Sequence, residues 1–96
     1  MKNYNKIVSI DEYLIREVLK ENESSIIRFV ELSSPFIYGG LYKFTQLNND
    51  EIDDLYQTIF LKLFENNKSR IKNWNGNSKF TTYLYMIVIN TVILQC

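Results

Sequence analysis

The sequence lacks several residue types on which catalysis and covalent stabilisation depend. It contains no histidine and a single cysteine, Cys96. Without histidine, the commonest general base and metal ligand is missing, and most hydrolytic mechanisms become difficult to assemble. One cysteine forms neither a disulfide within the chain nor a metal site of cysteines, and this fits a reducing, cytoplasmic setting. We therefore expect a protein that is not an enzyme and that holds no cofactor or metal.

Glycine, proline and long hydrophobic runs are also scarce. Three glycines, one proline and 46% hydrophobic residues indicate a compact globular domain and not a disordered or fibrous chain. The longest mostly apolar run, residues 83–89, is far shorter than the roughly 20 residues needed to cross a membrane. The N-terminal segment reaches an acidic residue by Asp11 and does not resemble a secretory signal. At 96 residues the chain is expected to form a single domain, with residues 1–10 flexible.

Acidic residues are missing from the last third of the chain. Residues 1–65 contain all 11 acidic residues and seven basic ones, a net charge of −4, whereas residues 66–96 have a net charge of +4. The difference indicates either two surfaces with different partners or a solvated acidic surface and four unrelated cations. The four cations are Lys68, Arg70, Lys72 and Lys79.

The hydrophobic periodicity of the first third of the chain is helical. Residues 11–20 place apolar side chains on one face, with Ser9 or Asp11 as N-cap, and this predicts a short amphipathic helix. Residues 22–32 repeat the pattern. The Ser-Ser-Pro sequence that follows is expected to end or kink this second helix, because proline has no N–H to donate to the preceding turn.

An apolar stripe resumes at Phe36 and contains two adjacent glycines. Gly39 and Gly40 either weaken a helix or allow another backbone to approach closely. Residues 46–50 are polar and turn-like, so they are expected to separate two helices.

Residues 50–66 give the clearest helix prediction. Four acidic residues in the first turns suit the positive end of the helix dipole, and a broad apolar face accompanies them. That face consists of Ile52, Leu55, Tyr56, Ile59, Phe60 and Leu63. The opposite face consists of Asp54, Gln57, Thr58, Leu61 and Glu65. A leucine among polar groups marks either a contact surface for another protein or a single exposed leucine.

Residues 71–90 contain two competing local signals. An Asn-Gly pair after Trp74 and before an aromatic, β-branched run is typical of a β-hairpin, but single-stranded nucleic-acid sites also use a polar loop with one aromatic residue. A hairpin strand at residues 71–74 would be too short and polar to shield its neighbour. A helix with Ser78 as N-cap would have one core-facing stripe, although its β-branched residues disfavour it. The stripe consists of Phe80, Tyr83, Leu84, Ile87, Val88 and Thr91. Local signals leave both structures open.

A family resemblance rests on three segments in order: ENESSIIRFVELSSPFIYGGLYKF (21–44), DEIDDLYQTIFLKLFE (50–65) and WNGNSKFTTYLYMIVIN (74–90). Together they resemble region 2 of the sigma-70 family of RNA polymerase sigma factors, particularly the extracytoplasmic-function group. The second resembles the family's Asp-Leu-hydrophobic-Gln motif, and the third its signature of aromatic, Gly, Ser, Phe and Thr residues before a Leu-Tyr pair. The resemblance favours the helix over the hairpin and implies an all-α fold, a compact bundle of three to four helices.

The resemblance also implies a surface for RNA polymerase. In sigma factors the helix of the second segment docks on the coiled coil of the polymerase β′ clamp. The corresponding residues here are Asp54, Gln57, Thr58, Leu61 and Phe64. An acidic rim around a leucine suits a basic partner helix, because complementary charge speeds encounter and fixes orientation.

The third segment implies a promoter DNA site. In the family, the loop before the last helix captures a base flipped from the nontemplate strand of the minus-ten element. The corresponding residues are Lys72, Trp74, Asn75, Gly76, Asn77, Ser78, Lys79, Tyr83 and Asn90. Loop amides and hydroxyls can contact the edge of an unstacked base, and the four cations of residues 66–96 can meet phosphates. Trp74 either stacks on a base or anchors the loop, and Asn90 lies either near the base pocket or on the helix surface.

The chain departs from the family pattern at Met86 and Ile89, where basic residues are common, and no segment resembles a second DNA-binding domain. We expect a transcription initiation factor domain that links core polymerase to a melted minus-ten element. The alternative is a sigma-like adaptor or co-sigma protein that binds polymerase or a regulatory protein without contacting DNA. An anti-sigma factor and a separate region 4 protein are candidate partners of either.

Overall fold

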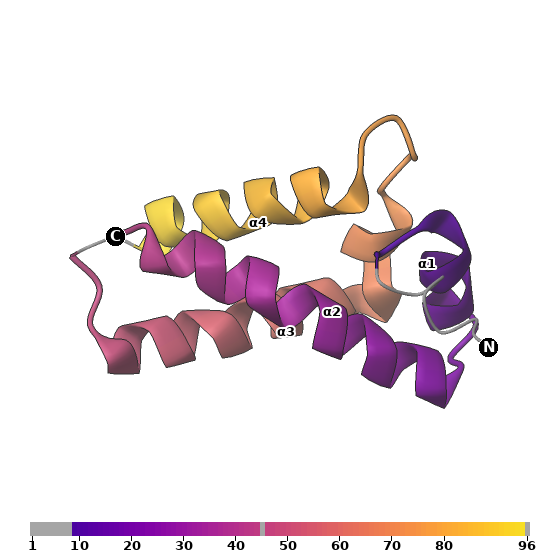
Figure 1. Cartoon of the computed structure of the whole chain (residues 1–96), viewed down its shortest axis with the longest axis horizontal. Coiled ribbons are helices and arrows are strands. Elements are labelled where there is room, and N and C mark those ends of the chain that lie inside the picture. The colour runs from indigo at the N-terminus through magenta and orange to yellow at the C-terminus, as the bar shows by residue number, and fades with distance from the viewer. Residues whose placement is uncertain (1–8, 45, 96) are drawn as a thin grey trace.

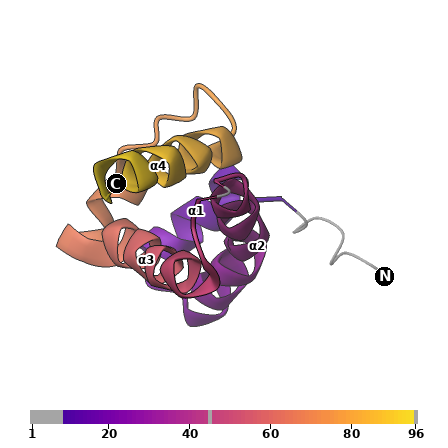
Figure 2. The same ribbon diagram turned by 90° about the vertical axis from the view of Figure 1, so that its left-hand side faces the viewer.

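Four α-helices make up the part of the chain that the computed structural model describes, residues 9–44 and 46–95. They are α1 (Glu12–Leu19), α2 (Glu23–Tyr42), α3 (Asn49–Lys72) and α4 (Phe80–Gln95). Figure 1 shows α2, α3 and α4 along the long axis of the molecule with α1 at one end. Figure 2 shows α2, α3 and α4 around a common interior. α2 contacts each of the other three helices. The expected all-α bundle of three to four helices is confirmed.

Side-chain caps define where the first three helices begin. Asp11 and Asn22 each accept the backbone N–H of the residue three positions later, at 2.9 and 3.0 Å. Asn48 and Glu51 form a capping box, in which each side chain accepts the other residue's backbone N–H. Each contact satisfies an N–H that has no partner within its own helix. Of the two N-caps predicted for the first helix, Asp11 is correct and Ser9 is not.

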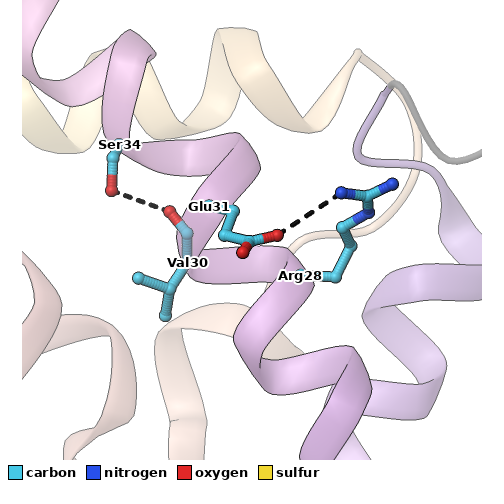
Figure 3. A network of polar contacts seen from close by, with 4 residues as sticks. All are labelled: Arg28, Val30, Glu31 and Ser34. Carbon is cyan, nitrogen blue, oxygen red and sulfur yellow. Dashed lines mark hydrogen bonds and ion pairs between the residues drawn. The ribbon is translucent and has the colours of Figure 1, made fainter.

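α2 continues through Pro35, so this proline does not end the helix. Beside it, the Ser34 hydroxyl donates to the Val30 carbonyl at 2.7 Å, and Arg28 pairs with Glu31 at 3.3 Å on the same helix (Figure 3). Proline in a helix interior costs about 3 kcal/mol. Because α2 buries apolar side chains on both sides of the proline, tertiary packing outweighs that cost.

The two adjacent glycines of α2 have different surroundings. A Cβ at Gly39 would meet nothing within 4 Å, whereas a Cβ at Gly40 would lie 3.1 Å from Val88 Cγ1 and 3.4 Å from Tyr85 Cε1 of α4. Gly40 therefore allows side chains of α4 to pack closely on α2, as one of the two predicted effects requires. The other effect, weakening of the helix at Gly39, stays a prediction.

α3 departs from the helix predicted over residues 50–66 near its C-terminal end. The regular helix ends at Phe64, and Asn66, Asn67 and Lys68 then have positive φ angles of 52°, 59° and 61° before a last helical turn. Asparagine adopts this left-handed conformation more readily than most residues. The predicted helix therefore ended about two residues too late, at a break that hydrophobic periodicity does not detect.

Lys68 is buried at this break and its ammonium group pairs with the Glu21 carboxylate. The prediction that Lys68 contacts phosphates is therefore wrong, because its charge is already engaged inside the protein. The other three cations of residues 66–96 are exposed: Arg70, Lys72 and Lys79.

Residues 80–95 are helical, so the helix is confirmed over the hairpin. The Lys79 carbonyl accepts from the Thr82 and Tyr83 N–H groups at 3.0 and 3.2 Å. The N-cap position is therefore Lys79 and not Ser78. The predicted stripe faces the core, with Tyr83 half-buried and the others buried: Phe80, Leu84, Ile87, Val88 and Thr91.

The N-terminal segment enters the core earlier than expected. Of residues 1–10, predicted to be flexible, residues 1–8 lie outside the described part of the chain. Ile10 is only 6% exposed and belongs to the core, directly before the Asp11 cap. Within the described residues, the structure has no helix whose length and apolar content would allow it to cross a membrane.

Alanine at the two adjacent glycines is expected to change stability in opposite directions. Gly39→Ala should raise the free energy of unfolding by about 0.5–1 kcal/mol, because alanine loses less backbone entropy and meets no neighbour. Gly40→Ala should lower it by about 1–3 kcal/mol, because the new methyl overpacks the contact with α4. Urea unfolding followed by far-ultraviolet circular dichroism measures both. Equal effects at the two positions would contradict the close approach of α2 and α4 at Gly40.

Candidate functional site

The exposed face of α3 carries a shallow groove beside an exposed leucine. The groove has a volume of about 390 Å³ and is lined by Tyr56, Gln57, Phe60, Leu61 and Phe64. Leu61 is 69% exposed. Of the predicted polymerase-binding residues, Gln57, Leu61 and Phe64 line this groove, while Asp54 and Thr58 lie on the same side of the helix. The structure therefore brings the predicted set together on one surface.

Tyr56 and Phe60 belong to this surface although their periodicity placed them on the core face. Both are half-buried, and the ring of Tyr56 stacks on Tyr38 with centroids 4.4 Å apart. The hydroxyls of Tyr56 and Ser34 hydrogen-bond at 2.7 Å, and Phe60 meets Tyr56 edge-on at 5.1 Å. The spacing of four residues between Tyr56, Phe60 and Phe64 is the pattern that would have indicated an aromatic wall along α3.

The acidic residues at the start of α3 have different roles. Glu51 belongs to the capping box, and Asp53 accepts from the Tyr38 hydroxyl at 3.3 Å. Burial, followed by the charge of Asp53, raises the pKa of Tyr38 above its ordinary value. Among the described residues, no hydrogen bond or ion pair engages the carboxylates of Asp50 or Asp54, and no cluster of acids could hold a metal ion. Asp54 is therefore an exposed acid without a partner among the described residues, on the side of α3 that carries the groove.

Trp74 holds the loop of residues 73–79 between α3 and α4. Its indole Nε1 donates to the Ser78 carbonyl at 3.0 Å, and its ring meets Phe80 edge-on with centroids 5.3 Å apart. Trp74 is half-buried against the core, whereas Asn75, Gly76, Asn77, Ser78 and Lys79 are exposed, as is Lys72 just before the loop. The anchoring role considered for Trp74 is therefore present, and stacking on a base stays a prediction.

A tight turn shapes the tip of this loop. The Asn75 side chain accepts the Asn77 N–H at 2.9 Å, and Gly76 has a φ of +83°. A Cβ at Gly76 would lie 2.7 Å from Glu12 Oε2 of α1. Gly76 is therefore required by its backbone conformation, and it also lets a carboxylate from the other end of the sequence lie against the loop.

A cavity of about 610 Å³ opens beside the loop. Its apolar walls are Ile10, Leu32, Phe36, Trp74 and Phe80. Its charged groups are Asp11 and Glu12 from the start of α1 and Lys79 from the end of the loop. Both acids and Phe36 were not predicted for this site, because no local pattern in the sequence indicates that the start of α1 and residue 36 lie beside residues 74–80.

Asn90 lies apart from this loop. An α-helix rises about 1.5 Å per residue, so Asn90 lies roughly 16 Å beyond Lys79 along α4. Asn90 is exposed and lines a separate cavity of about 300 Å³ together with Lys62 and Arg70. Tyr83 lies between the two regions, and its hydroxyl donates to the Arg70 carbonyl at 2.7 Å. The structure therefore groups Asn90 with two cations and not with the loop cavity.

Replacing Gly76 with alanine adds only one methyl group, but we expect it to destabilise the domain and to change the surroundings of Trp74. Gly76→Ala should cost about 1–2 kcal/mol, since a positive φ places Cβ against the following carbonyl, and it should shift the fluorescence of Trp74, the single tryptophan. Gly76→Asn is the matched control and should cost less, because asparagine tolerates this conformation. Urea unfolding and tryptophan emission spectra measure both. An alanine variant with unchanged stability and emission would show that the turn does not require glycine.

Comparison with protein families assigns the chain. The model of Sigma-70 region 2 matches residues 29–95, from the middle of α2 to the end of α4. This range contains the groove of α3, the loop and Asn90. Searches of curated proteins and of solved structures gave no significant match. Because the family model covers most of the chain, the chain belongs to the sigma-70 region 2 family, whose domains bind RNA polymerase and take part in transcription initiation.

Proposed function

We propose that this domain docks on the coiled coil of the polymerase β′ clamp through α3 and captures an unstacked base of the promoter's minus-ten element beside the loop of residues 73–79. The observation that carries the proposal is the exposed groove of α3, where Leu61 is 69% exposed beside aromatic walls. An exposed leucine in an apolar groove leaves surface whose burial by a partner is favourable, by about 2 kcal/mol for such a side chain.

Charge supports a basic partner for this groove. The Asp54 carboxylate has no partner among the described residues, whereas Glu51 and Asp53 are engaged within the domain. Thr58 donates its hydroxyl to the Asp54 carbonyl at 2.9 Å, so its polarity is satisfied locally. Asp54 and Gln57 are therefore the polar groups that would orient a partner helix whose apolar residues cover Leu61.

The exposed groups of the loop favour contact with single-stranded DNA. Its exposed side chains are amides, a hydroxyl and a cation, and these suit base edges and phosphates. The neighbouring cavity offers apolar and aromatic walls, which flipped bases use for stacking. An unstacked base beside Trp74 therefore has both an apolar surface and nearby hydrogen-bonding groups.

One observation favours the alternative, an adaptor that binds polymerase or a regulatory protein without contacting DNA. α4 contains no charged residue, and its outer side exposes Met86, Ile93 and Leu94, with Leu94 78% exposed. A helix that contacts duplex phosphates is normally basic. The alternative assigns this apolar side to a protein, so DNA binding separates the two functions.

Binding to an isolated β′ clamp coiled coil tests the α3 surface. The domain should bind with micromolar or tighter affinity, about 8 kcal/mol. Asp54→Arg should weaken binding by about tenfold or more, since it places a cation against a basic helix, and Gln57→Ala should weaken it through a lost hydrogen bond. Isothermal titration calorimetry measures each constant.

Glu23→Arg is the matched control, because it makes the same charge change at an exposed position in the first turn of α2. It should bind like the unmodified domain. If all three variants bind equally well, the coiled coil does not use this face, and if folded domain binds no coiled coil, the docking proposal fails.

Salt dependence of single-stranded DNA binding tests the loop and separates the proposal from the adaptor. Three exposed cations meeting phosphates give a slope of log K against log salt of about −2, at roughly −0.7 for each contact. Lys72→Ala and Lys79→Ala should each reduce the slope by about 0.7. Lys43→Ala is the control, because its ammonium lies over the Tyr85 ring at the end of α2 remote from the loop (Figure 1). Fluorescence anisotropy of a labelled oligonucleotide measures the slopes, and no binding at low salt would support the adaptor.

A further inference from the structure

The cavity beside the loop contains a carboxylate that the proposed function does not use. Glu12 stands in the first turn of α1, and its Oε2 lies so close to Gly76 that a Cβ there would be 2.7 Å away. Glu12 also lines a second hollow of about 270 Å³ on the Asn75 side of Trp74. Among the described residues, no hydrogen bond or ion pair engages its carboxylate. Asp11, by contrast, uses its side chain to cap α1.

The rest of the cavity suits a planar, partly apolar ligand. Trp74 and Phe80 form one aromatic pair in its wall, and Phe36 adds a ring that is 50% exposed. A volume of about 610 Å³ lies in the range of small-molecule sites, so a base and part of its sugar fit. Lys79 lines the same cavity and can hold the phosphate of the nucleotide whose base enters it. These groups provide stacking and charge, but none of them distinguishes one base from another.

We infer that Glu12 selects the captured base and favours one that presents an amino group on its edge: cytosine, adenine or guanine, and not thymine. The inference rests on the proposed capture of a base beside the loop. An ionised carboxylate only accepts hydrogen bonds, so it needs donors on the base. Cytosine offers its N4 amino group, the usual partner of a glutamate or aspartate. Thymine offers two carbonyl oxygens on either side of one N–H, and these repel a carboxylate.

Affinity for oligo(dC) and oligo(dT) of equal length tests this selection, because the two bases differ in whether an amino group or a carbonyl occupies position 4. The unmodified domain should bind oligo(dC) at least about fivefold more tightly, the lower end of the discrimination given by one good base contact. Glu12→Gln should reduce the ratio to about one, mainly by binding oligo(dT) more tightly, since an amide also donates. Oligo(dU) serves as a control for the methyl group of thymine.

Glu23→Gln is the matched protein control, because it removes the same charge from an exposed helix start outside the cavity and should keep the preference. Circular dichroism establishes that each variant is folded. If the unmodified domain binds both oligomers equally, or if Glu12→Gln keeps the preference for oligo(dC), selection by Glu12 is refuted while single-strand binding stands. If the folded domain binds neither oligomer at low salt, the inference fails together with the DNA-binding part of the proposed function.

Discussion

The edge-to-face contact between Phe29 and Phe80 is the interaction on which the rest of the domain depends. Both rings are fully buried, with centroids 5.6 Å apart, and they join α2 to the start of α4. Phe29 also meets Phe64 of α3 at 5.9 Å, and Phe80 meets Trp74 of the loop at 5.3 Å. Such pairs add about 0.5–1.5 kcal/mol each beyond the area that they bury. One pair of phenylalanines therefore connects three helices and the loop at the centre of a 96-residue domain.

The same series of rings reaches both candidate surfaces. From Phe64 it continues along α3 through Phe60 and Tyr56 to Tyr38 of α2, with neighbouring centroids 6.3, 5.1 and 4.4 Å apart. Tyr56, Phe60 and Phe64 form the wall of the groove, and Trp74 at the other end of the series lines the loop cavity. Aromatic side chains have few rotatable bonds, and these rings also pack against one another along α3 and onto α2. Binding of a partner to either surface therefore costs little side-chain conformational entropy.

Sequence alone predicted the features that depend on neighbouring residues. Periodicity and caps located α1 and most of α3, because an N-cap such as Asp11 acts on the first turn next to it. Features set by distant packing were missed or left open. Pro35 signals a helix end locally, yet burial on both sides carries α2 through it. The Asn-Gly turn is real, but whether a strand or a helix follows depends on the core that Phe80 joins, so only the family resemblance decided for the helix. The contact of Glu12 with the loop joins two segments far apart in the sequence, so no local pattern indicates it.

A count of charged residues along the sequence overestimates the positive charge near the loop. Lys68, one of the four cations in the basic part of the chain, pairs with Glu21 of the acidic part, and Glu12 brings an acidic charge against the loop itself. Phosphate attraction, which carries no sequence information, is therefore weaker than a net charge of +4 implies. Base contacts must then supply a larger share of any DNA affinity. Discrimination between bases becomes larger relative to the total binding free energy. Under the proposed function, weak affinity would be sufficient, because a domain docked on polymerase would hold the strand at a high effective concentration near the loop.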